Sequence, residues 1–216
     1  MSRLETAVRL QLRGTGAVCC LVMTACGAGN IERAPIGALT ELETGITGSA
    51  GEPNLAVGPD GTVHVSWIEQ QSDKAHALKF TTVRNGRLSP ARTIAAGPLW
   101  FVNWADFPML TVLRGGEIAA HWLQRSGPGK YSYDVKIAVS RDHGATWGAP
   151  FTPHRDGTES EHGFVSLFAH GNGFGAVWLD GREYAAAKAR GAREGEGEMT
   201  LRSTTFTPDG TLGAEI

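Results

Sequence analysis

The carboxylate with the clearest chemical potential is Asp106, which stands between Trp104 and Phe107 ahead of an apolar segment. An apolar environment disfavours the ionised form and raises the pKa of a carboxyl group, as a general acid working near neutral pH requires. Asp106 is therefore the candidate catalytic residue, and Trp104 is a candidate substrate-binding residue. The alternative is that Asp106 caps the start of a strand by accepting loop N–H groups.

A second polar group follows Trp178 in the stretch Trp-Leu-Asp-Gly-Arg. Arg182 could bind a ligand carboxylate through two parallel hydrogen bonds, with Asp180 beside it. Alternatively, Asp180 and Arg182 pair with each other in a turn that binds nothing. Tyr133 and Glu161, from two other polar loops, complete the candidate substrate-binding residues.

No metal site or cofactor is expected. His154 and His162 lack metal-ligand spacing with any partner, so we expect them to be surface histidines. The charged tract 184–199 is expected to form a solvated loop with a short helical start, or a lid over the site.

The most specific motif covers residues 140–147 and reads Ser-Arg-Asp-His-Gly-Ala-Thr-Trp. Its spacing describes a turn in which the Asp accepts backbone N–H groups and the Gly supplies a positive φ. The Ser and Thr could bond across the hairpin, and the Trp ring could pack on the sheet. We assign a structural role to Ser140, Asp142, Gly144, Thr146 and Trp147.

This S-x-D-x-G-x-T-W pattern resembles the Asp-box (BNR) repeat of the sialidase superfamily. The members of this superfamily are six-bladed β-propellers, found in exported glycosidases and their relatives. The stretch at 178–182 is similar to one in many sialidase-like proteins. The resemblance implies a catalytic face, on the side away from the Asp-box, with a general-acid Asp, an arginine triad and a Tyr–Glu nucleophile pair. The Arg-Ile-Pro motif of the family is not matched by Arg33-Ala34-Pro35, and we expect the Tyr–Glu pair in later blades outside this chain.

A repeat positions these residues. Trp67, Trp122 and Trp178 are 55 and 56 residues apart, and each ends an alternating apolar segment preceded by a turn cluster. Period-2 alternation predicts strands with one buried face, and each unit opens and closes with a hairpin. Four antiparallel strands per unit predict an all-β fold, a β-propeller with blades at about 51–102, 103–157 and 158–216. The alternative is an all-β sandwich.

The N-terminus indicates export. Three arginines and an apolar stretch within residues 1–25 form a signal peptide, and Val22-Met23-Thr24-Ala25-Cys26 resembles the lipobox of bacterial lipoproteins. We therefore expect Cys26 to be lipidated and the protein to be anchored to the bacterial cell envelope, after a tether at 26–50. An ordinary secretory signal is the alternative.

The composition argues against a nucleic-acid partner, and the number of repeats indicates an incomplete propeller. A formal net charge of −2 provides no basic field for nucleic acid, and 29 glycines suit a fold rich in tight turns. Three blades cannot close a ring, so we expect the chain to be the N-terminal half of a six-bladed propeller, or to pair with a second copy.

The sequence therefore supports two functional hypotheses. The first is a sialidase-like glycoside hydrolase acting on terminal acidic sugars of glycans at the cell envelope, with this chain alone inactive. The alternative is a non-catalytic propeller lipoprotein that binds glycans or proteins.

Overall fold

The computed structural model describes residues 37, 39–46, 48–193 and 196–216. The chain divides into two units, Met1–Thr40 and Glu41–Ile216, and the second holds the elements described below. The expected signal peptide, the lipidation residue Cys26 and Arg33 lie outside the described residues, as does most of the expected tether.

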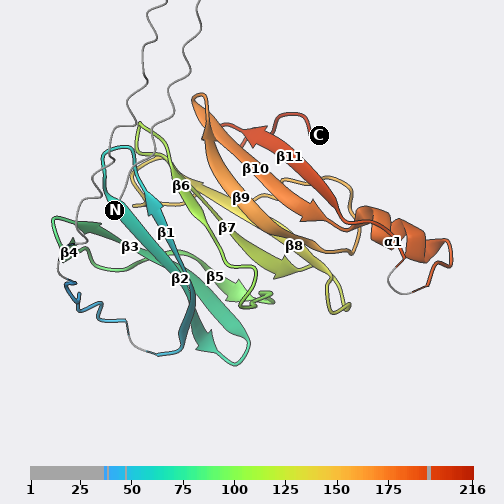
Figure 1. Ribbon diagram of the computed structural model, residues 1–216, viewed down its shortest axis with the longest axis horizontal. Coiled ribbons are helices and arrows are strands. Elements are labelled where there is room, and N and C mark those ends of the chain that lie inside the picture. Colours follow the sequence, from blue (N-terminus) through green and yellow to red (C-terminus); the bar gives the residue numbers. More distant parts are fainter. Residues whose placement is uncertain (1–36, 38, 47, 194–195) are drawn as a thin grey trace, which may run out of the picture. The chain divides into compact units, whose positions relative to one another are not determined.

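The second unit contains three successive antiparallel sheets (Figure 1). The first sheet has five strands: β1 (Ala50–Val57), β2 (Val63–Ser72), β3 (Ala75–Arg84), β4 (Arg87–Leu88) and β5 (Arg92–Pro98). The second sheet has three strands: β6 (Leu110–Val112), β7 (Ile118–Arg125) and β8 (Tyr133–Ser140). The third sheet also has three: β9 (His162–His170), β10 (Gly173–Asp180) and β11 (Thr200–Phe206), with helix α1 (Arg182–Ala189) between the last two.

The all-β prediction is confirmed, and each sheet opens with the expected hairpin, whose second strand contains the tryptophan and continues two to five residues beyond it. The outer strands differ from the expected four-stranded units. β5 pairs with β3 in the first sheet. In the second and third sheets the outer segment is joined by isolated bridges, Ile137↔Phe151 and Phe206↔Leu212, and by a few further backbone hydrogen bonds such as those between Ser203 and Ile216. In the second sheet the outer segment includes Pro150, which has no N–H to donate to a ladder.

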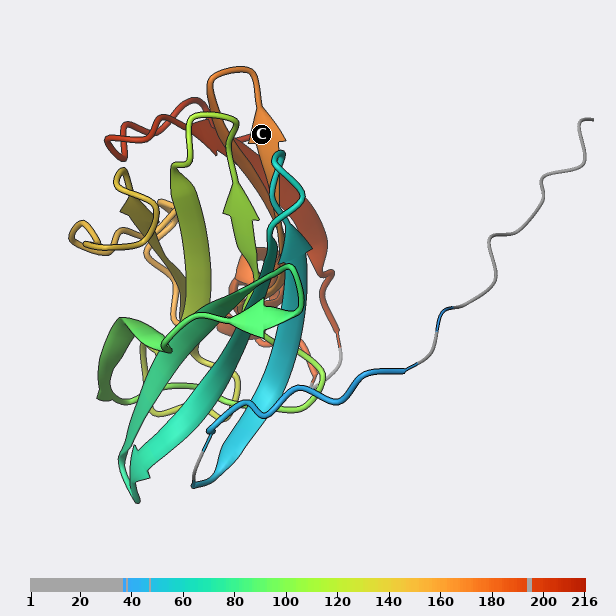
Figure 2. The ribbon, with the colours of Figure 1, turned by 90° about the vertical axis from the view of Figure 1, so that its left-hand side faces the viewer.

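The second sheet packs between the other two (Figure 2). Side chains of β7 alternate between its two faces: Ala119 and Leu123 join a core with Trp178 of the third sheet. Ile118, Ala120 and Trp122 join a core with residues of the first sheet, such as Phe80. Alternation along one strand therefore supplies both interfaces.

The 140–147 motif forms a compact turn after β8. Asp142 accepts hydrogen bonds from the Thr146 N–H (2.8 Å), the Thr146 hydroxyl and the Ser140 hydroxyl (2.7 Å). The Ser140 hydroxyl accepts one from the Gly144 N–H (2.8 Å), so Ser140 and Thr146 bond within the turn rather than across the hairpin. These hydrogen bonds lower the pKa of Asp142 to about 2, those from Thr146 contributing most.

The same turn joins the first two sheets. Gly144 has φ 77°, and a Cβ there would lie 2.4 Å from the ring of Phe80 on β3. The half-buried Trp147 meets that ring edge-on, with the centroids 6.0 Å apart.

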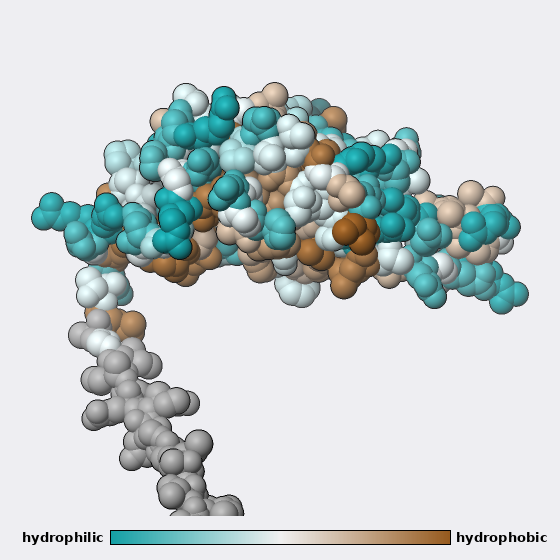
Figure 3. All heavy atoms as spheres, turned by 90° about the horizontal axis from the view of Figure 1, so that it is seen from above, coloured by the Kyte–Doolittle hydropathy of each residue, from teal (hydrophilic) through white to brown (hydrophobic). Residues whose placement is uncertain are grey.

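Apolar side chains are also exposed on the outer sheets. They include Leu55 and Val57 on β1, and Leu201 on β11. Figure 3 shows apolar side chains gathered on parts of the surface between hydrophilic ones. Among the described residues, no helix has the length and apolar character needed to cross a membrane.

Candidate functional site

Asp106 lies in the loop between β5 and β6 and is only 5% exposed. The Asn103 side chain caps this loop by accepting the N–H groups of Ala105 and Asp106. The Asp106 carboxylate accepts the N–H of Phe164 on β9 at 2.9 Å. The loop thus holds the carboxyl group between the second and third sheets.

The environment of Asp106 favours its neutral form. Burial raises the pKa of Asp106 to about 6; the Phe164 N–H opposes the rise, and the negative charge of Glu161 adds to it. A carboxyl group with this pKa can exist protonated near neutral pH and can donate a proton.

Tyr133 and Glu161 form a hydrogen-bonded pair beside Asp106. Tyr133 begins β8, and Glu161 is bridged to it immediately before β9. The phenol donates to Glu161 Oε1 at 2.8 Å. A Cβ on Gly163 would lie 2.2 Å from Asp106 Oδ2 and 3.0 Å from the phenol oxygen, so this glycine lets the two groups approach. Burial, and then the bond to Glu161, raise the pKa of Tyr133.

The sequence analysis named Tyr133 and Glu161 separately and did not pair them, because the two residues lie 28 positions apart. The resemblance had placed a Tyr–Glu pair outside this chain. The structure shows a hydrogen-bonded Tyr–Glu pair within the chain.

The phenol is covered in this structure. Tyr133 is 1% exposed, and the Phe101 ring stacks on it with centroids 4.0 Å apart. The exposed Arg125 places its guanidinium 5.3 Å from the Phe101 ring centroid. Four aromatic residues that lie within three positions of Asp106, Tyr133 or Glu161 in the sequence have exposed side chains: Trp104 (88% exposed), Phe107, Tyr131 and Phe164.

Two bulky residues near this site have left-handed backbone conformations. Phe164 has φ 50°, and Leu99, whose carbonyl accepts the Arg125 N–H, has φ 63°. Non-glycine residues adopt such angles at a cost, and they cluster at functional sites. At Phe164, the strained backbone presents the N–H that Asp106 accepts.

Asp180 and Arg182 occupy a separate buried cluster. The guanidinium of Arg182 binds Asp180 through two hydrogen bonds, 2.8 and 2.7 Å, and also pairs with Asp156 and Glu215. Trp178 Nε1 donates to Asp180 as well. Burial opposes ionisation of Asp180, but the bonds from Arg182 and Trp178 outweigh it and lower its pKa. The structure therefore favours the ligand-free turn over a free arginine clamp.

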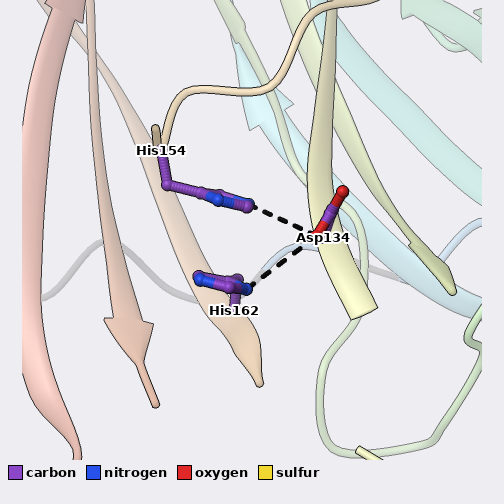
Figure 4. A group of neighbouring side chains, drawn as sticks. All are labelled: Asp134, His154 and His162. Atoms are coloured by element: carbon purple, nitrogen blue, oxygen red, sulfur yellow. Dashed lines mark ion pairs between the residues drawn. The ribbon is translucent and has the colours of Figure 1, made fainter. Parts of the chain in front are cut away.

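The expectation that His154 and His162 are surface residues is wrong. They are 7% and 0% exposed, and their rings stack in parallel with centroids 3.7 Å apart. His154 comes from the loop between β8 and β9, and His162 begins β9. Figure 4 shows both rings directed at Asp134 of β8. Pairing of distant segments creates this cluster, which sequence spacing does not reveal.

The two clusters are arranged back to back. Consecutive residues in strands point to opposite sides. Tyr133 and Glu161 therefore face Asp106, while Asp134 and His162, the next residue in each case, face away from it.

A cavity of about 880 Å³ lies elsewhere, at the Asp142 end of β8. It is lined by the 140–147 turn and by Pro208–Gly210, and not by Asp106 or Tyr133. We place the candidate site at Asp106 because two acidic groups whose pKa values are raised by burial, Asp106 and Tyr133, meet there.

No family model matches the chain, and no curated protein matches it. Solved structures with a similar chain path include an α-L-arabinofuranosidase mutant from Fusarium graminearum, with an iminosugar inhibitor, at 15% identity and a TM-score of 0.48; the alignment covers 77% of this chain and 48% of that one. An endo-xylanase from Bacteroides thetaiotaomicron aligns at 12% identity and a TM-score of 0.47, covering 79% and 61%. An α-L-arabinofuranosidase from Clostridium thermocellum aligns at 14% and 0.45, covering 76% and 52%.

The chain thus spans about half to three fifths of the length of these structures. Similarity at this level identifies no activity, and none of the three is described as a sialidase. The resemblance to sialidases rests on the sequence motifs alone.

Proposed function

We propose that this chain contributes the reacting groups of a retaining glycoside hydrolase, with Asp106 as general acid and Tyr133 as nucleophile. The observation that supports this most strongly is the buried Asp106 carboxyl group, whose pKa is raised to about 6, beside the Tyr133–Glu161 hydrogen bond. Glycosidases that use tyrosine as nucleophile are a known exception to the pair of carboxylates.

Each residue has a role in the chemistry. The Tyr133 oxygen attacks the anomeric carbon as the glycosidic C–O bond breaks, and Glu161 takes the phenolic proton. Asp106 gives its proton to the departing oxygen. Water then cleaves the tyrosyl glycoside, with Asp106 acting as base and Tyr133 regaining its proton from Glu161. Phe101 must move for a sugar to reach the phenol, because its ring covers it.

The proposed substrates are glycans with terminal acidic sugars. Arg182 is occupied by Asp180, Asp156 and Glu215, so it is a poor candidate for the sugar carboxylate. Arg125 is the better candidate. It is exposed beside Phe101, and among the described residues it forms no ion pair.

The proposed setting follows from the sequence. The three sheets correspond to blades of a propeller at about 51–102, 103–157 and 158–216, and exposed apolar residues such as Leu55 and Leu201 suit contacts with further blades or a second copy. The leader indicates a protein exported to the bacterial cell envelope and anchored through Cys26.

A non-catalytic glycan- or protein-binding propeller is the second candidate. The burial of the Tyr133 phenol under Phe101 favours it, because a nucleophile must reach its substrate. In this case the exposed aromatic residues around Trp104 bind the glycan without turnover.

Hydrolysis of fluorogenic glycosides by the protein containing this chain distinguishes the two. We expect release from a sialoside and not from an α-L-arabinofuranoside, with activity reduced at least 100-fold by Asp106→Asn and Tyr133→Phe. Asp73→Asn, on an exposed turn, is the matched control. Glycan binding without hydrolysis of any substrate supports the second candidate. Hydrolysis that survives Tyr133→Phe excludes the proposed nucleophile.

A further inference from the structure

We propose that Asp134, His154 and His162 bind a divalent metal ion of the zinc type, on the side of β8 and β9 opposite to Tyr133 and Glu161. The site lies at the junction of the second and third sheets. This inference does not depend on glycosidase activity.

The hydrogen bonds of the two histidines orient them as metal ligands. Nδ1 of His154 lies 3.2 Å from Asp156, and Nε2 of His162 lies 3.2 Å from the same carboxylate. A carboxylate can only accept hydrogen bonds, so each imidazole donates an N–H hydrogen bond to Asp156. A metal-binding histidine almost always donates its other ring N–H to a carboxylate, a carbonyl or water. Asp156 plays that part for both rings.

The remaining nitrogens then present lone pairs to one region. His154 Nε2 and His162 Nδ1 each lie 4.0 Å from Asp134 Oδ1 (Figure 4). His162 Nδ1 is also 3.2 Å from the Tyr133 carbonyl oxygen, which is a further acceptor. His154 Nε2 is buried and has no hydrogen-bond partner. A buried polar atom without a partner is destabilising, and a bound cation removes that cost.

A proton on His162 Nδ1 is the competing explanation. It satisfies the Tyr133 carbonyl and turns His162 into an imidazolium. It leaves His154 Nε2 without a partner, and it places a positive ring against a parallel ring 3.7 Å away. A metal ion satisfies both nitrogens together.

The distances allow one ion to reach all three ligands. The three ligand atoms lie within 4.8 Å of one another, and each ring nitrogen is 4.0 Å from Asp134 Oδ1. Zinc lies about 2.0–2.2 Å from nitrogen and carboxylate oxygen, so these atoms must move closer together to share one ion. The two rings are parallel within 2°, which sets their lone pairs side by side rather than converging. Binding therefore requires at least one ring to turn, and we expect the stack to open.

The surrounding charges also suit a divalent cation. Three carboxylates lie against the histidines: Asp134, Asp156 and Asp180. Two permanent cations face them, Lys136 on the other oxygen of Asp134 and Arg182 on Asp156 and Asp180, and Arg182 also pairs with Glu215. The carboxylates thus outnumber the permanent cations.

The ligand types select the kind of ion. Two imidazole nitrogens and one carboxylate suit Zn²⁺, whereas Ca²⁺ and Mg²⁺ prefer oxygen ligands. The neighbouring group Asp156, His162 and Asp180 is a weaker candidate, because the Arg182 guanidinium already binds both carboxylates. At the proposed site the ion links β8, the His154 loop and β9.

Titration of the chelator-treated chain with Co²⁺ and Zn²⁺ tests the proposal. Thiols are alkylated first, so that Cys19, Cys20 and Cys26 cannot bind the ions. We expect one Co²⁺ per chain, visible d–d absorption that Zn²⁺ abolishes, and a rise in Tm with Zn²⁺ but not with Ca²⁺ or Mg²⁺.

Variants locate the site. Affinity should fall at least tenfold in His154→Gln and in Asp134→Asn, and should be unchanged in His170→Gln, at the exposed end of β9. Circular dichroism verifies that each variant is folded, and the partly exposed Asp134 provides the milder substitution if His154→Gln does not fold. Failure of the intact chain to bind either ion, or equal binding by the folded ligand variants, overturns the proposal.

Discussion

Replacing Asp106 with asparagine tests the environment on which the proposed general acid depends. Asparagine has nearly the same shape, and its side-chain oxygen can still accept the Phe164 N–H that Asp106 accepts at 2.9 Å. The substitution therefore removes the ionisable group while preserving its contact with β9.

The pKa of Asp106 sets the magnitude and the sign. Folding raises this pKa from 3.8 to about 6, mainly through burial. Below about pH 3 the carboxyl group is largely neutral in both the folded and the unfolded state, so it has little effect on stability. As the pH rises through 4 to 6, the unfolded state ionises first and the folded state loses stability. Above pH 6 the penalty levels off at roughly 3 kcal/mol, since one pKa unit corresponds to 1.36 kcal/mol.

We therefore expect Asp106→Asn to be more stable than the wild type at pH 7.5, by about 2–3 kcal/mol, and nearly equal to it at pH 3.5. Urea denaturation followed by circular dichroism at both pH values measures this difference. Asp73→Asn, an exposed substitution, should change stability little at either pH. An Asp106→Asn protein that is equally or less stable at pH 7.5 would refute the raised pKa, and with it the reason for choosing this residue as the acid.

Three further substitutions test the packing and the turns. Arg182→Gln leaves the fully buried Asp180 carboxylate without its cation and should cost about 3–5 kcal/mol by urea denaturation; a neutral effect contradicts the structural role given to this arginine. Gly144→Ala places a Cβ against the Phe80 ring at a φ of 77° and should lower the stability by about 1–3 kcal/mol, and an unchanged Tm argues against that contact. Trp178→Ala empties a fully buried site in the core between the second and third sheets and should cost about 3–5 kcal/mol; a loss below about 1 kcal/mol is incompatible with the described packing.

The strands were predictable because their signals are local. Alternating apolar residues, turn residues and a repeated tryptophan all lie within a few positions of one another, and they predicted the hairpin that opens each sheet. The bonds of the 140–147 turn are equally local. The outer strands of the second and third sheets are less regular than predicted: a few backbone hydrogen bonds join these segments to β8 and β11, but they form no continuous strand.

The site was predicted less completely because it is made by contacts between distant segments. Asp106 could be selected from its apolar neighbours, but its partner Phe164 is 58 positions away. The Tyr133–Glu161 pair and the burial of His154 and His162 depend on how the loop between β8 and β9 returns to the start of β8. The local sequence around these residues does not predict the path of that loop.

The back-to-back arrangement at the start of β8 and β9 makes the two clusters inseparable. A strand cannot shift by one residue without turning every side chain to its other face. A single-residue insertion just before Val135 or Phe164 would therefore send the wrong group to each side, exchanging phenol for carboxylate or carboxylate for imidazole. A change in length within the loop at 141–160 leaves the phase of β8 and β9 unaltered, but that loop also holds the 140–147 turn and His154. Related sequences should accordingly keep residues 133–134 and 161–162 in a fixed phase, as two adjacent pairs.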